Sequence, residues 1–93
     1  MKRIEYERKV KFEFSNNLLI VDREKEFIEG SFGCIPFSEI KGVWKNNHKK
    51  RFHMVHYVKV LTRDRIIQVT PDLKKEEDVD KIEKYLKKVL RIK

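Results

Sequence analysis

The hydrophobic pattern of this 93-residue chain changes its period once, at Pro71-Asp72. Before this point apolar and polar residues alternate, which is typical of strands with one face on a core and the other in water. After it apolar residues recur every three or four positions, as on one face of a helix. The sequence therefore predicts a mainly-β α+β domain, in which antiparallel strands are followed by a single helix.

The first segment shows the clearest alternation. One parity carries apolar and aromatic side chains, namely Ile4, Tyr6, Val10, Phe12 and Phe14. The other parity is charged, so we expect a half-buried strand that bends at Arg8 or begins after it. Ser15-Asn16-Asn17 then predicts a turn, because Asn tolerates a left-handed backbone and these side chains bond nearby backbone groups.

Further strands are expected where β-branched and aromatic residues gather between turn residues. These segments are 18–21, 27–32, 40–44, 52–62 and 65–70, with 46–50 as a hairpin loop. Pro36 cannot donate to a sheet, so 35–37 is placed at an edge or at the start of a strand. Trp44 continues the parity of Ile40 and Gly42, which favours burial in the core or at its edge.

The terminal helix is predicted from about Glu76 to Arg91. Its apolar face is formed by Val79, Ile82, Leu86, Val89 and Leu90. Acidic residues lead the helix and basic residues close it, as the helix dipole prefers, and Pro71-Asp72 is a breaker and possible cap. The whole pattern predicts a bent antiparallel sheet, or partly open barrel, of six to seven strands capped by this helix.

Length and composition indicate a single folded domain. Ninety-three residues with 40% apolar content suit a single folded domain over residues 1–93 and exclude a disordered chain. Cys34 is the only cysteine, so an internal disulfide is impossible and a reducing compartment is the simplest location. The N-terminus has no apolar run behind its basic residues, so a signal peptide is not expected. We expect a cytoplasmic protein.

The positive charge is concentrated in the middle of the chain. Residues 40–70 carry eight Lys or Arg against one acidic residue, Asp64, whereas the whole chain has a net charge of +8. Like charges repel, so such an excess usually indicates an anionic partner. Lys45 to Arg51 would gather at one hairpin tip and Arg63 and Arg65 at another turn, toward opposite ends of the sheet.

Two stretches resemble small bacterial pleckstrin-homology-like (PH-like) domains. The segment Ile35-Pro36-Phe37-Ser38-Glu39-Ile40-Lys41-Gly42-Val43 is similar to the segment that enters the middle of the sheet in that family. Residues 58–64 with 66–69 resemble its late hairpin, and the helix would plug one end of the sheet. The resemblance implies a binding platform. It does not carry over the phosphoinositide pocket, because the first hairpin has only Lys11 close before its Ser-Asn-Asn loop.

The candidate binding residues lie on the basic hairpin and the strand after it. Lys59 should face water, and residues of its parity would share that outer face, which exposes Val55 and Tyr57 beside positive charge. The predicted partner-binding set is Lys45, Lys49, Lys50, Arg51, His53, Val55, Tyr57 and Lys59. A solvated loop that only aids solubility is the alternative interpretation of the lysines.

Other constellations predict no catalytic centre, metal or cofactor. His48, His53 and His56 are close in sequence, but His53 and His56 differ in parity, so His56 is expected as a partly buried, hydrogen-bonded core residue. Cys34 has no base positioned beside it by any local pattern. Gly30-Ser31-Phe32-Gly33 lacks the spacing of a phosphate-binding loop. Enzymatic activity is therefore not expected.

The sequence favours a binding or adaptor module that meets an acidic protein surface through the basic hairpin. Nucleic-acid binding through the same lysines and arginines is the first alternative, and peripheral binding to anionic membrane lipid is the second. An exposed edge strand could also pair two copies of the chain.

Overall fold

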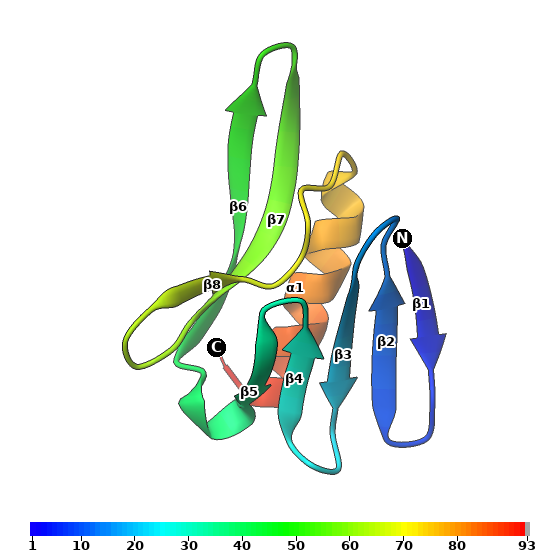
Figure 1. Ribbon diagram of the computed structural model, residues 1–93, viewed down its shortest axis with the longest axis vertical. Helices are drawn as coiled ribbons and strands as arrows, with labels where there is room; N and C mark the ends of the chain where they lie inside the picture. The colour runs from blue at the N-terminus through cyan, green and yellow to red at the C-terminus, as the bar shows by residue number, and fades with distance from the viewer. Residues whose placement is uncertain (93) are drawn as a thin grey trace.

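The computed structural model describes residues 1–92, which form eight antiparallel strands in two sheets, one 3-10 turn and one helix (Figure 1). The mainly-β α+β architecture with one C-terminal helix is confirmed. The strands number eight because the first predicted strand is two strands and residues 33–36 form one of their own.

The first sheet is a meander of five strands in chain order. Its members are β1 (Lys2–Glu5), β2 (Lys9–Glu13), β3 (Leu18–Asp22), β4 (Phe27–Gly30) and β5 (Gly33–Pro36). The chain reverses between β1 and β2, where the backbone N–H of Tyr6 donates to the carbonyl of Lys9 at 2.9 Å. Tyr6 is consequently exposed rather than part of the core. Phe12 pairs with Leu19 and Val21 with Ile28 across the strands, and all four are fully buried.

The second sheet contains β6 (Gly42–Lys50), β7 (His53–Leu61) and β8 (Ile66–Gln68), and a 3-10 turn, η1 (Phe37–Glu39), leads into it. The prediction of a loop at 46–50 is wrong, because these residues pair with β7 and the turn is Arg51-Phe52. Polar residues stay in the ladder here because they have cross-strand partners. Asn46 Nδ2 donates to the Tyr57 hydroxyl at 2.7 Å, and Asn47 pairs with His56.

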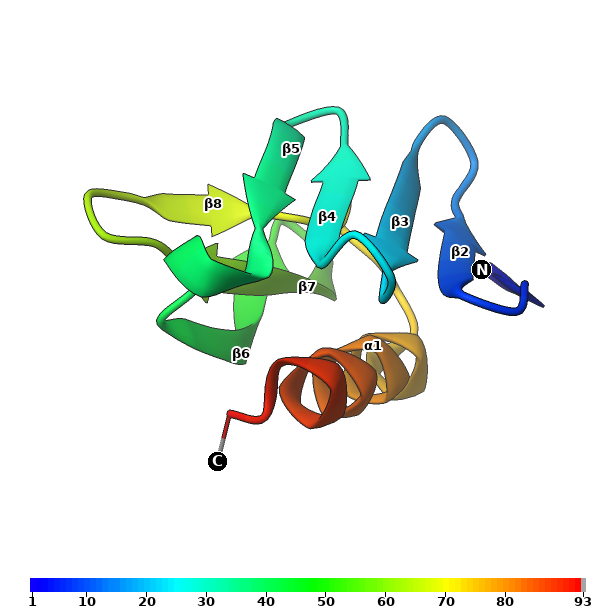
Figure 2. The ribbon, with the colours of Figure 1, turned by 90° about the horizontal axis from the view of Figure 1, so that it is seen from below.

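The helix α1 (Glu76–Leu90) packs on β6 and β7 and closes the core between the sheets (Figure 2). Val79, Ile82 and Leu86 are its fully buried residues, and the predicted extent is confirmed within one residue. Asp72 is not the cap. Lys75 occupies that position without a side-chain bond, and acidic residues in the first turn complement the helix dipole instead.

β6 and β7 continue past the body of the protein as a two-stranded projection (Figure 1). We call residues 46–57 the arm. Its direction follows the longest dimension of the molecule, 41 Å, and its two-residue turn forms one extreme end of the structure. The turn at the end of the arm therefore lies far from the hydrophobic core that stabilises the fold.

Substitutions of one phenylalanine in the core and one in the arm test how much each region contributes to stability. Phe12→Ala removes a fully buried ring, so we expect the free energy of unfolding to fall by about 3–5 kcal/mol. Phe52→Ala removes a ring that is 90% exposed, and the change should stay below about 0.5 kcal/mol. Urea unfolding followed by tryptophan fluorescence measures both. A large loss in Phe52→Ala would show that the arm turn packs on the body.

Candidate functional site

The turn at the end of the arm has an unusual composition for its geometry. Lys50 pairs with His53, so Arg51 and Phe52 alone make the reversal, and neither has a positive φ. Two-residue hairpin turns favour Asn-Gly or similar pairs, which adopt the left-handed backbone at no steric cost. Phe52 is also 90% exposed, although its ring would gain from burial. Turn formation therefore does not explain why these two residues are here.

Lys45 lies at the base of the arm and is engaged by the helix. Its Nζ lies 2.9 Å from Asp80 Oδ1 and 3.5 Å from Glu76 Oε2. Its backbone N–H donates to Glu83 Oε2 at 2.7 Å. The hydrogen bond to Asp80 is the main reason why the pKa of Lys45 is raised above 10.5. Lys45 was predicted to contact a partner, but the structure places its charge among the acidic groups of α1.

Lys50 also has a partner within the chain. Its Nζ lies 3.0 Å from Asp72 Oδ2, and this hydrogen bond holds the pKa of Asp72 below 3.8. Asp72 belongs to the segment beyond the far edge of β7, where Leu73 and His56 exchange backbone hydrogen bonds of 2.8 Å. The Lys50 side chain must therefore cross the outer face of β7 to reach it.

The prediction of an exposed Val55 is wrong, because this residue is only 3% exposed. Val55 lies on the outer face of β7 opposite His48, so its side chain is covered although it lies outside the core cluster. Tyr57, on the same face, is half-buried and its hydroxyl accepts the hydrogen bond from Asn46. Val55 is thus not part of an exposed apolar surface, and Tyr57 is only partly exposed.

Lys59 and Trp44 face each other across the strands. The Nζ of Lys59 lies 5.2 Å from the centre of the Trp44 ring, in a cation–π contact. Both side chains are half-buried, and Val43, not Trp44, belongs to the core cluster. The parity inferred from Ile40 does not continue into β6, because residues 37–41 turn the chain between the two sheets.

The histidines of the arm lie in different environments. His56 is 9% exposed, and its Nδ1 lies 2.7 Å from Asn47 Oδ1, which confirms the expected buried, hydrogen-bonded ring. Glu76 Oε2 lies 3.5 Å from the same nitrogen. His48 and His53 are exposed. Within residues 1–92 no group of three His, Cys, Asp or Glu side chains is arranged to hold a metal ion.

The exposed end of the arm is the candidate site, and we call residues 48–54 the arm tip. Lys49 and Arg51 form no ion pair with any residue that the structure describes. Phe52 and the half-exposed Met54 supply apolar surface between them. The arm tip therefore combines uncompensated cations with an aromatic ring. This combination is typical of a binding interface rather than of a catalytic centre.

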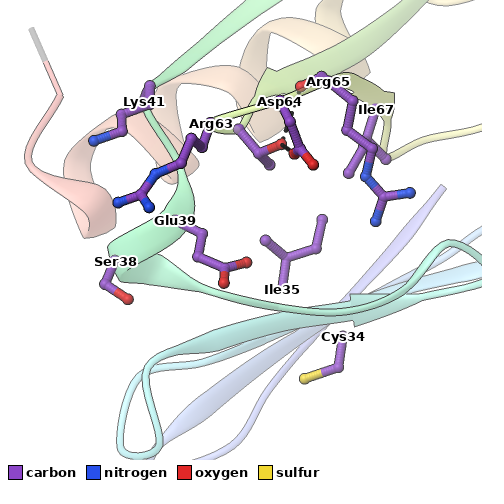
Figure 3. Close-up of a pocket in the computed structure, with 10 residues that line it drawn as sticks. Cys34, Ile35, Ser38, Glu39, Lys41, Arg63, Asp64, Arg65 and Ile67 are labelled. Atoms are coloured by element: carbon purple, nitrogen blue, oxygen red, sulfur yellow. Dashed lines mark hydrogen bonds between the residues drawn. The ribbon is translucent and has the colours of Figure 1, made fainter.

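Arg63 and Arg65 of the predicted second turn border a pocket of about 600 Å³, shown in Figure 3. Lys41 and Arg63 lie at one side of this pocket and Arg65 at the other, with the carboxylates of Glu39 and Asp64 between them. This turn and the arm tip lie at opposite ends of the second sheet, as the sequence predicted (Figure 1). The basic block is therefore two separate features, and the second has mixed charge.

Comparison of the chain with protein-family models, with curated proteins and with solved structures found no match in any of the three. Within residues 1–92 no helix combines the length and the apolar character that a membrane span requires.

The Lys50–Asp72 contact predicts how stability depends on acid. Because the pKa of Asp72 is lowered in the folded state, its contribution is present above pH 3.8 and is lost as the pH falls below that value. We expect urea midpoints of the wild type to fall more between about pH 4.5 and 2.5 than those of Asp72→Asn. Glu29→Gln, which alters an exposed carboxylate on β4, is the matched control. Identical acid profiles for wild type and Asp72→Asn would contradict the contact.

Proposed function

We propose that this chain is a PH-like binding module that engages an acidic protein surface with its arm tip. The order of its elements supports this proposal, because a strand meander, a second small sheet and a helix against them match the resemblance in residues 35–43 and 58–69. A fold of this kind supplies a platform, and the function lies in the site that it carries.

The observation that carries the proposal is the exposure of Phe52. A ring that is 90% exposed at the end of a two-stranded arm is positioned to enter a pocket on another molecule. Aromatic and Arg side chains dominate binding energy in protein interfaces. Arg51 is its neighbour in the turn, and its planar guanidinium suits bidentate contact with a carboxylate. Lys49 adds a second cation on the adjacent strand.

The small number of uncompensated cations favours a protein over a nucleic acid. Lys45 and Lys50 are engaged by α1 and Asp72, and Lys59 lies against Trp44. The cations that remain on the arm form a compact group around the Phe52 ring. They would contact only a few phosphates of a nucleic acid. Nucleic-acid binding stays the second candidate for one reason. A two-stranded ribbon fits the DNA major groove, and an exposed Phe can enter between bases.

Affinity capture from the native host tests the proposal. Wild-type protein and Tyr6→Ala, which alters an exposed aromatic residue on the first sheet, should retain the same acidic protein after nuclease treatment. Phe52→Ala and Arg51→Glu should lose it, because these changes remove the anchor ring and reverse the adjacent charge. With the purified partner, we expect Phe52→Ala to weaken the affinity by about 30-fold, or 2 kcal/mol.

Two results would contradict the protein interface. Retention of the same protein by Phe52→Ala and Arg51→Glu would remove the arm tip from it. Retention that disappears with nuclease would instead favour the nucleic acid, and the slope of affinity against log salt on a duplex would then count the phosphates engaged.

A further inference from the structure

A cavity of about 750 Å³ lies at the end of α1 away from the arm. The last turns of α1 form one wall, and the turn between β3 and β4 and the 3-10 turn η1 form the opposite side (Figure 2). Residues of β1 close one end. This volume is in the range of small-molecule sites, and the cavity is separate from the proposed arm interface.

Two residues of this cavity hold a backbone conformation that favours glycine. Glu26 has a φ of 57° and Arg91 a φ of 58°, and they are the only non-glycine residues with a positive φ within residues 1–92. Arg91 ends α1 in a position usually held by Gly, where its N–H and that of Ile92 satisfy the last carbonyls. Strained positions cluster at ligand sites, and here both border the same cavity with long charged side chains.

Tyr85 supplies the second observation. Its hydroxyl is buried and is the one buried side-chain polar atom without a hydrogen-bond partner among the described residues. Such a group reduces stability unless something binds it. Burial raises the pKa of Tyr85 above 10, although the positive charges of Arg23 and Arg3 oppose this. The phenol is therefore protonated at neutral pH and is a hydrogen-bond donor.

The charged groups near Tyr85 favour an anion. Arg23 is fixed by hydrogen bonds from its Nη2 to the carbonyls of Tyr6 and Glu7, at 3.3 and 2.9 Å. Arg3 lies 4.9 Å above the Tyr85 ring and pairs with Glu5 at 2.8 Å. Arg3, Arg23 and Tyr85 all line the cavity, so both guanidinium groups lie beside the phenol.

The rest of the cavity has an apolar side and further charge. Phe37, Val89 and Leu90 form apolar wall, and all three pack partly against the core. Four cationic side chains and two carboxylates, those of Glu5 and Glu26, line the cavity, so its net charge is positive. A ligand that suits both regions has an anionic group at one end and an apolar body at the other.

We propose that this cavity binds a small organic anion, with its phosphate or carboxylate held by Arg23, Arg3 and the Tyr85 hydroxyl and its apolar body on Phe37 and Leu90. Charge-assisted hydrogen bonds from two guanidinium groups and one phenol match the acceptor geometry of either head group. The apolar wall distinguishes the ligand from a free inorganic ion.

Thermal melting and calorimetry with phenyl phosphate test the proposal. We expect the melting temperature of the wild type to rise with ligand concentration, and inorganic phosphate or benzyl alcohol, which each supply one half of the ligand, to bind more weakly. Arg23→Gln should weaken binding about tenfold, as expected for one charge-assisted bond. Vesicles that contain phosphatidic acid distinguish a lipid head group from a soluble anion as the source.

Tyr85→Phe is the most informative variant. It removes the buried hydroxyl, so we expect the free protein to melt at a higher temperature and phenyl phosphate to bind about fivefold more weakly. A structural role alone would change the melting temperature without changing affinity. Lys84→Gln, an exposed cation on α1 that does not border the cavity, is the matched control.

Three outcomes would overturn the proposal. These are no response of the wild type to phenyl phosphate or to the vesicles, unchanged affinity in both Arg23→Gln and Tyr85→Phe, or an equal loss of affinity in Lys84→Gln. Phe52→Ala should bind phenyl phosphate as the wild type does, so failure of the arm interface and failure of this cavity are distinguishable.

Discussion

Acidic side chains of α1 bind the edge strand β6 at Lys45. The arm at one end of the molecule and the cavity at the other end both depend on this contact. Glu83 accepts the backbone N–H of Lys45, and Asp80 accepts from its side chain. An unpaired strand edge is a site for unwanted pairing, and here a helix covers it. Past Lys45 the strand is held by its pairing with β7 and by the Lys50–Asp72 contact. The same contact therefore fixes α1 against the sheet and determines where the arm begins.

The helix α1 thus contributes to two regions of different charge, an acidic one at the base of the arm and a net positive one at the cavity. Its first half presents Glu76 and Asp80 to the base of the arm, whereas Tyr85 and Arg91 border the cavity at its other end. Two of the eight cations in residues 40–70, Lys45 and Lys50, are engaged by α1 and by Asp72. The charge that is not engaged within the chain is consequently smaller and more local than the sequence excess suggests, and on this ground we propose a compact contact at the arm tip.

The parts of the fold that depend on local pattern were predictable. The helix from Glu76 and the core positions of β2 follow from spacing alone. The strand at Asn46 to Lys50 was missed because its polar residues are held by partners on β7. Val55 was misplaced because parity assigns a residue to one face of a strand but does not report what covers that face. The cavity at Tyr85 was also missed. Its one sequence signal is a charged residue at turn positions such as Glu26, where Gly or Asn is usual.

Several departures from local rules gather in two regions of the structure, the arm tip and the cavity at Tyr85. A domain of this size is stable by only a few kcal/mol, so a strained residue or an unpartnered buried hydroxyl costs a considerable fraction of the total. Phe52 lies at the end of the arm, and Glu26, Tyr85 and Arg91 surround one cavity, whereas the core between them is well packed. Sequences that fold well agree with their structure at every level except where binding requires otherwise. The arm tip and the cavity gather several such departures, and for this reason we propose that both bind ligands.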